Sequence, residues 1–172
     1  MPDITAVNAL DRDGFVALLG QTFEHAPWVA ERAFGAGPFT DVADLHAAMM
    51  RVVRDASQAE RLAFLNGHPE LAGPEARARS MTADSVSEQG SAGLDRLSAA
   101  DLDRFDRLNA AYRTTFGFPF IVAVRGRGRD EILALFEQRL GRDATTEADA
   151  TLAEIAAITR MRLDRIVLEI GP

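Results

Sequence analysis

Three residues of this sequence could carry out acid and base chemistry if the fold brought them together: His68, Glu88 and Arg162. His68 follows an apolar run that ends at Gly67, a residue suited to the left-handed position just after a helix. It precedes Pro69, which favours an extended backbone at His68. An imidazole held at such a stiff corner can point into a cleft and exchange a proton near neutral pH. The other interpretation is a structural histidine at a helix end, and the residues around His68 leave both open.

Glu88 lies in the short segment SVSEQ at residues 85–89, next to Gln89. Ser85 and Glu88 have the spacing of a capping box, which would give Glu88 a purely structural role at the start of a helix. Gln89 carries both a donor and an acceptor and could bind a ring amide. This segment therefore has a structural and a functional interpretation.

Arg162 stands out on a helical wheel of residues 146–170, the last and longest predicted helix. At about 100° per residue, its isoleucines and leucines form one apolar arc, and Arg162 falls inside that arc. Arg160 and Arg165 fall at or beyond its margins. A guanidinium that faces the core needs anionic or hydrogen-bonding partners. Arg162 is thus either one partner of a structural ion pair or part of a binding site.

The rest of the chain predicts an all-α single domain over residues 1–172, because helical spacing recurs along it without alternating strands. The segment FGFPFIVAV, residues 116–124, resembles a buried strand, but Pro119 is unwelcome in a central strand, so we expect an extended core segment. About eight helices are expected: residues 11–24, a short helix after Pro27, one from Asp44, one from Ser57 to the His68 corner, one from Ser85, one from Ser98 to Gly117, one that ends at Gly141, and residues 146–170.

Composition excludes several classes of function. The net charge of −7 argues against nucleic-acid binding, which needs surplus positive charge. The chain has no cysteine, and its 19 basic residues are all arginine, so thiolate chemistry and lysine imines are excluded, including pyridoxal-dependent mechanisms. His25, His46 and His68 lack the paired spacing of a metal site on one helix. With no secretion signal and no apolar run of about 20 residues, a cytoplasmic protein that does not bind membranes is expected.

Five stretches together resemble the family of decarboxylases that act on 2-oxo-4-hydroxy-4-carboxy-5-ureidoimidazoline (OHCU) and form (S)-allantoin in urate degradation. The resemblance covers nearly the whole chain. The stretches are FEHAPWVAERAF (residues 23–34), HPELAG (68–73), SVSEQGSAGLDRL (85–97), LNAAYRTTFGFPFIVAV (108–124) and EIAAITRMRLDRIV (154–167).

The resemblance implies a cofactor-free carboxy-lyase without a metal, built as an all-α bundle that forms a homodimer. It places the catalytic histidine, acid and arginine of the family on His68, Glu88 and Arg162. One departure is Thr115, where many members of the family have a lysine. The substrate contacts that the resemblance implies fall on Pro69, Ser85, Val86, Ser87, Glu88, Gln89 and the backbone of Phe120, Ile121, Val122, Ala123 and Val124.

Two other functions remain open at this stage. A binding module without catalysis could use the same fold, although it could lose the acid and base residues that are all present here. A different cofactor-free lyase or hydrolase could act on a related heterocycle. Turnover of OHCU, as opposed to tight binding without turnover, distinguishes the enzyme from the binding module.

Overall fold

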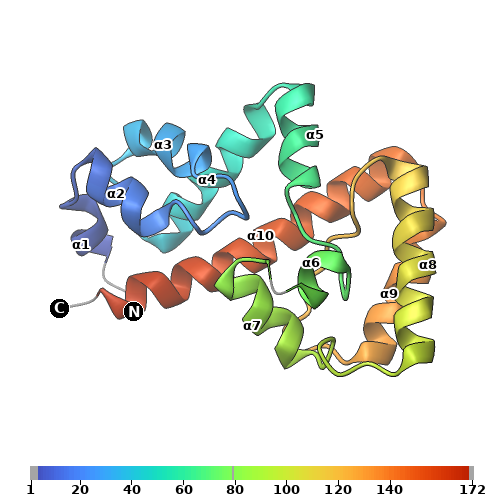
Figure 1. The fold of residues 1–172 in the computed structure, drawn as a ribbon. Helices are drawn as coiled ribbons and strands as arrows, with labels where there is room; N and C mark the ends of the chain where they lie inside the picture. Colours follow the sequence, from blue (N-terminus) through green and yellow to red (C-terminus); the bar gives the residue numbers. More distant parts are fainter. Residues whose placement is uncertain (1–3, 79, 171–172) are drawn as a thin grey trace. The chain divides into compact units, whose positions relative to one another are not determined.

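The computed structural model of the protein describes residues 4–78 and 80–170, which form α-helices, one 3-10 helix and no β-strand (Figure 1). The all-α prediction is confirmed. The chain divides into two compact units: Met1–Gly67 with Ala156–Pro172, and His68–Ile155. In the described residues, no helix is long and apolar enough to cross a membrane. The single domain over residues 1–172 stays a prediction.

The first unit contains the N-terminal helices and the last part of the C-terminal helix. Helix α3 packs against α2 and α4, and the core of this unit includes the fully buried Phe15, Leu45 and Met49. The helices are α1 (Ile4–Asn8), α2 (Arg12–Leu19), α3 (Trp28–Ala33), the 3-10 helix η1 (Phe34–Ala36), α4 (Val42–Asp55) and α5 (Gln58–Asn66).

The capping box predicted for α5 is confirmed. The Ser57 side chain accepts a hydrogen bond from the Glu60 amide, and the Glu60 carboxylate accepts one from the Ser57 amide. Arg32 donates to the same carboxylate at 2.7 Å, and these bonds lower the pKa of Glu60 to about 2, with the Arg32 bond the largest cause. The start of α5 is therefore fixed by local sequence.

The second unit contains α6 (Pro74–Arg77), α7 (Ala83–Ser91), α8 (Ala99–Phe116), α9 (Arg129–Leu140) and the first part of α10 (Ala144–Glu169). Helices α8 and α9 pack against each other (Figure 1). As predicted, Ser98 caps α8, and the helix ends at Gly117, whose φ of 80° is left-handed. Glycine adopts that conformation without the steric cost that other residues incur.

The core of the second unit is aromatic. Tyr112 of α8 is fully buried, and the centroid of its ring lies 5.8 Å from that of Phe118, 5.4 Å from that of Phe120 and 5.9 Å from that of Phe136. Phe120 stacks on Phe136 with ring centroids 3.9 Å apart. These contacts hold Phe118 and Phe120 in the core. The extended core segment begins at residue 118 and not at residue 116 as predicted, because α8 continues to Phe116 and ends in the left-handed Gly117.

Three other local predictions are wrong. The helix predicted over residues 11–24 ends at Leu19. Ser85 does not cap a helix, because the cap of α7 lies three residues earlier, where the side chain of Thr82 accepts a hydrogen bond from the Ser85 amide. Gly67 is right-handed, with φ of −73°, rather than left-handed. A Cβ atom at Gly67 would lie 3.3 Å from the Phe64 carbonyl oxygen, so close approach to the preceding turn, and not the sign of φ, favours glycine here.

Candidate active site

The loop HPELAG, residues 68–73, carries His68 between helices α5 and α6. His68 lies in a bend, and both His68 and Pro69 are half-buried. An imidazole in this position is accessible enough to exchange a proton and enclosed enough to be oriented. The corner predicted from the His-Pro pair is therefore present, and the chemistry of His68 depends on how firmly the loop is held.

The loop is held by side chains from two helices. Gln89 of α7 accepts a hydrogen bond from the Ala72 amide at 3.0 Å and donates to the Glu70 carbonyl at 3.4 Å. Asn109 of α8 donates to the Leu71 carbonyl at 3.0 Å, and Arg113 of α8 donates to the Glu70 carboxylate at 2.9 Å. Because a buried amide that satisfies a loop carbonyl is costly to remove, these contacts fix the backbone that follows His68.

The loop also contains backbone strain. Ala72 has a φ of 50°, in the left-handed region that residues with a Cβ atom rarely adopt. Its amide is bound by Gln89, and its carbonyl oxygen accepts a hydrogen bond from Arg77 at 3.1 Å. Strained residues of this kind persist only where the surroundings hold them, and they cluster at functional sites.

Helix α7 presents the predicted segment on two different faces. Ser85 and Gln89, four residues apart, are buried, while Val86 and Ser87 are exposed. Glu88 is half-buried. The five residues therefore do not all lie on one face of α7.

A cleft of about 380 Å³ lies within the second unit beside α7. Among the predicted site residues it is lined by Val86 and Gln89, and Arg77 and Asp95 give it a cation and an anion. Its other lining residues are mostly apolar: Ala72, Ala76, Met81, Gly90, Leu94, Leu97 and Leu102.

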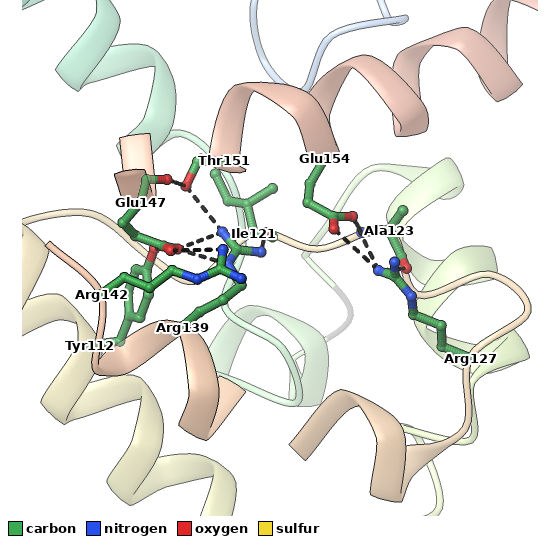
Figure 2. A network of polar contacts seen from close by, with 9 residues as sticks. All are labelled: Tyr112, Ile121, Ala123, Arg127, Arg139, Arg142, Glu147, Thr151 and Glu154. Carbon is green, nitrogen blue, oxygen red and sulfur yellow. Dashed lines mark hydrogen bonds and ion pairs between the residues drawn. The ribbon is translucent and has the colours of Figure 1, made fainter. Parts of the chain in front are cut away.

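The extended segment at residues 118–124 is buried from Phe118 to Val124, and polar side chains bind its backbone (Figure 2). Arg139 of α9 donates to the Ile121 carbonyl oxygen at 2.8 Å. Glu154 of α10 accepts a hydrogen bond from the Ala123 amide at 2.8 Å. The five predicted backbone contacts at residues 120–124 thus lie on a segment with a fixed conformation.

Arg139 belongs to a buried ionic cluster with Glu147, and both side chains are almost fully enclosed. Two nitrogens of Arg139, Nε and Nη2, lie 2.8 and 2.6 Å from Glu147 Oε1, and Nη2 also donates to Thr151 at 3.2 Å (Figure 2). The Tyr112 hydroxyl donates to the same carboxylate oxygen at 2.5 Å. Burial, and next the bond to Glu147, raise the pKa of Tyr112 well above its usual value. The phenol therefore stays protonated and acts as a donor.

Arg162 is buried in the first unit, as the wheel predicted, with a side chain only 5% exposed. Its Nη1 atom lies 3.2 Å from Glu24 Oε2 and 3.3 Å from the Thr22 carbonyl oxygen. The ion pair that the sequence left open is therefore present, and Glu24 supplies the anion. Arg160 and Arg165 are much more exposed and pair with carboxylates one turn further along α10, as expected for positions outside the buried arc.

The other two histidines have structural surroundings. His46 Nε2 lies 2.9 Å from the Thr159 hydroxyl, and burial, assisted by Arg160, lowers the pKa of His46. His25 is exposed and has a left-handed backbone, with φ of 48°. Across residues 4–78 and 80–170, no group of three or more histidine and acidic side chains is arranged to hold a metal ion.

Comparison with known proteins decides the family. The model of the OHCU decarboxylase family matches residues 8–164, which is most of the chain. The chain is 44% identical over 157 residues to the 2-oxo-4-hydroxy-4-carboxy-5-ureidoimidazoline decarboxylase of Haloferax volcanii, and the match covers 91% of each protein. This chain belongs to the OHCU decarboxylase family.

Two further comparisons agree with this assignment. The OHCU decarboxylase of Halalkalicoccus jeotgali is 38% identical over 162 residues, which are 94% of this chain and 90% of that protein. A crystal structure of (S)-allantoin synthase superposes with a TM-score of 0.73 at 27% identity. The superposition covers 95% of this chain and 53% of that one, so this chain spans about half the length of that protein. The resemblance inferred from the five sequence stretches is confirmed.

Membership of the OHCU decarboxylase family does not assign roles to single residues. The structure groups His68, Glu88 and the other predicted residues up to Val124 in the second unit, and Arg162 in the first. The catalytic roles of His68, Glu88 and Arg162 and the predicted substrate contacts stay predictions. The departure at Thr115 falls on an exposed residue of α8, whose hydroxyl donates to the Ala111 carbonyl one turn earlier.

Four residues with well-defined contacts were not predicted: Glu24, Arg139, Glu147 and Glu154. Arg139 follows the buried Phe136 by three residues, so a wheel of α9 would have placed it near the apolar face. Glu147 is in the first turn of α10, where an exposed acid is common because it interacts favourably with the helix dipole. Its position in the sequence therefore gave no indication that it is buried. Glu24 lies in a turn beyond the end of α2, in a stretch that the sequence pattern assigned to a helix.

Proposed function

We propose that this protein catalyses the cofactor-free decarboxylation of OHCU to (S)-allantoin in urate degradation. The observation that carries the proposal is the match to the Haloferax volcanii decarboxylase over nearly the full length of both proteins. The family model covers the stretches that contain His68, Glu88 and Arg162. The absence of lysine and cysteine from the sequence is compatible with a reaction that needs no covalent intermediate on either residue.

The chemistry requires little from the protein beyond orientation and one proton transfer. When carbon dioxide leaves, the electron pair of the broken C–C bond stays on the former carboxyl-bearing carbon, and the conjugated ring with its adjacent C=N group accepts it. The pair forms a double bond to the neighbouring carbon, which bears the ureido group. One proton must then be delivered to one face of that neighbouring carbon, while the hydroxyl group loses its proton and becomes the ring carbonyl, to give a single enantiomer. An imidazole is suited to this transfer because its pKa lies near neutral pH.

His68 is the proposed general acid and base. The contacts of Gln89 and Asn109 with the following residues of the loop support this role, because a proton donor must hold one direction relative to the substrate. Glu88, three residues after the buried Ser85, is proposed to fix the imidazole tautomer or to bind the hydroxyl and ureido groups. Gln89 is proposed to act mainly by holding the loop, since both ends of its amide already bind loop backbone.

Arg162 is proposed to bind substrate oxygens, and its ion pair with Glu24 sets the orientation of the guanidinium. An arginine can do both because its guanidinium has five donors in a fixed plane.

We also propose that the protein is a homodimer in the cytoplasm. The dimer rests on the family resemblance, and the location rests on the sequence features discussed above.

The function is tested with the purified protein and OHCU generated from urate by urate oxidase and the hydrolase that follows it. Unaided decay gives racemic allantoin, so the optical activity of the product, measured by circular dichroism, identifies an enzymatic reaction. We expect faster disappearance of OHCU and a single enantiomer. Racemic product at the uncatalysed rate would refute the proposal, and tight binding of OHCU without turnover would indicate a binding module instead.

A further inference from the structure

Three charged side chains bind the backbone of the extended segment at residues 120–124 (Figure 2). On one peptide, Arg139 donates to the Ile121 carbonyl oxygen at 2.8 Å. Two residues later, Glu154 accepts a hydrogen bond from the Ala123 amide at 2.8 Å, and Arg127 donates one to the Ala123 carbonyl oxygen at 2.9 Å. Arg127 and Glu154 also pair with each other at 3.1 Å. Both polar groups of Ala123 are therefore held by one ion pair.

As a result, the two sides of the segment differ in how their backbone N–H and C=O groups are hydrogen-bonded. In an extended chain, the backbone N–H and C=O groups of alternate residues point to opposite sides, so those of Ile121 and Ala123 share a side and those of Val122 face the other. In the described part of the chain, the backbone of Val122 makes no hydrogen bond to another residue. An edge of this kind can bind a ligand that itself carries neighbouring N–H and C=O groups, as when an extended peptide adds to the edge of a sheet.

We propose that Glu154, supported by Arg127, is a positioning residue that fixes the backbone of residues 120–124, the segment to which the family resemblance assigns backbone contacts with the substrate. The proposal rests on the proposed function, since OHCU offers N–H and C=O groups in its ring and ureido arm. Glu154 acts through the Ala123 amide. Hydrogen bonds to an ionised acceptor are roughly twice as strong as neutral ones, so Glu154 restrains this backbone more firmly than a neutral side chain would.

Glu154 is a better target for substitution than the other members of the network. Arg139 and Glu147 are fully buried, and a variant of either risks loss of the fold. The side chains of Glu154 and Arg127 are 20% and 29% exposed, so water can solvate what a substitution leaves behind. Glu131 provides a matched control, because this exposed acid lies 3.5 Å from the same Arg127 and, among the described contacts, does not bind the segment.

The experiment compares Glu154→Ala, Glu154→Gln and Glu131→Ala with the wild-type protein, using kcat and KM for OHCU, melting temperature, and hydrogen exchange at the Ala123 amide. For Glu154→Ala we expect kcat/KM to fall by about 10- to 100-fold, mainly through KM, because a displacement of about 1 Å in a binding group can cost this much. The Ala123 amide should exchange faster. Glu154→Gln keeps an oxygen acceptor for that amide and should recover most of the loss, while Glu131→Ala should resemble the wild type.

Two results would overturn the positioning role. One is an unchanged kcat/KM in Glu154→Ala, and the other is an equal loss in Glu131→Ala, which would assign the effect to the charge of Arg127 alone. Failure of the proposed function is recognised separately, because the wild-type protein itself would then not turn over OHCU. In that case hydrogen exchange still tests whether Glu154 restrains the backbone of Ala123. Equal protection of the Ala123 amide in the wild type and in Glu154→Ala would refute this restraint.

Discussion

Replacement of Arg162 separates its structural role from its proposed role in catalysis. The Glu24 and Arg162 side chains are 1% and 5% exposed, so Arg162→Met removes the buried guanidinium that lies 3.2 Å from the Glu24 carboxylate. Breaking a buried pair in this way costs roughly 3 to 5 kcal/mol of unfolding free energy. In a chain of 172 residues each kcal/mol lowers the melting temperature by about 2 to 4 °C, so the expected decrease is about 6 to 20 °C.

A second substitution identifies the source of that loss. Glu24→Gln in the Arg162→Met background removes the carboxylate charge but keeps the shape of the side chain, so at least half of the lost stability should return. Thermal and urea unfolding followed by circular dichroism measure both values. If the double variant is no more stable than Arg162→Met, the buried carboxylate is not the cause, and the reasoning from the ion pair is refuted.

Arg162→Lys tests the catalytic role at a temperature well below both melting points. Lysine keeps the positive charge beside Glu24 but lacks the planar fork of arginine. We expect kcat/KM for OHCU to fall by about a hundredfold if Arg162 binds substrate oxygens. Arg160→Lys and Arg165→Lys are the controls, since these more exposed residues pair along α10, with Asp164 and Glu169. Wild-type kinetics in Arg162→Lys would leave Arg162 with a structural role alone.

Three further predictions concern the histidine, the buried tyrosine and the oligomeric state. His68→Asn should lower kcat by about two to four orders of magnitude at an unchanged melting temperature, and wild-type turnover in this variant would leave His68 a structural residue. Because the pKa of Tyr112 is raised in the folded state, its stabilising effect is present below about pH 10, the unfolded value, and is lost as the pH rises above it. Urea unfolding between pH 8 and pH 11 should therefore show a steeper loss of stability in the wild type than in Tyr112→Phe, and equal slopes would contradict this. Light scattering at micromolar concentration should give twice the mass of 18.7 kDa, and a monomer would refute the dimer without affecting the chemistry.

The helices that the sequence predicted well are those whose signals are local. Ser57 with Glu60 and Ser98 with Asp101 mark the starts of α5 and α8, because a cap is formed by residues three apart in the chain. Ser85 with Glu88 has the same spacing but does not form a cap. Starting at Thr82 instead adds three residues to α7 and places Asp84 in the first turn, where the helix dipole favours an acid. Local spacing alone could not choose between two overlapping caps.

The positions of buried charges were predictable only where a long helix provided a clear wheel. Arg162 was found because α10 is 26 residues long, so that its wheel contains enough isoleucine and leucine residues to show an apolar side. Arg139 lies one residue before the end of α9, which has only 12 residues, and its partner Glu147 belongs to a different helix. Which carboxylate meets which guanidinium is set by tertiary packing, and the sequence pattern of a single helix has no information about it.

Arginine rather than lysine suits the two buried cationic sites. Each described unit encloses one guanidinium: Arg162 with Glu24 in the first, and Arg139 with Glu147 in the second. Arg139 satisfies a carboxylate, a hydroxyl and the Ile121 carbonyl oxygen at once, from three different nitrogens. Its guanidinium also lies 4.6 Å from the centre of the Phe120 ring. A lysine at this position would present its three donors from one atom and could not reach acceptors spread across a plane. The segment at residues 120–124 therefore depends on arginine geometry as well as on charge.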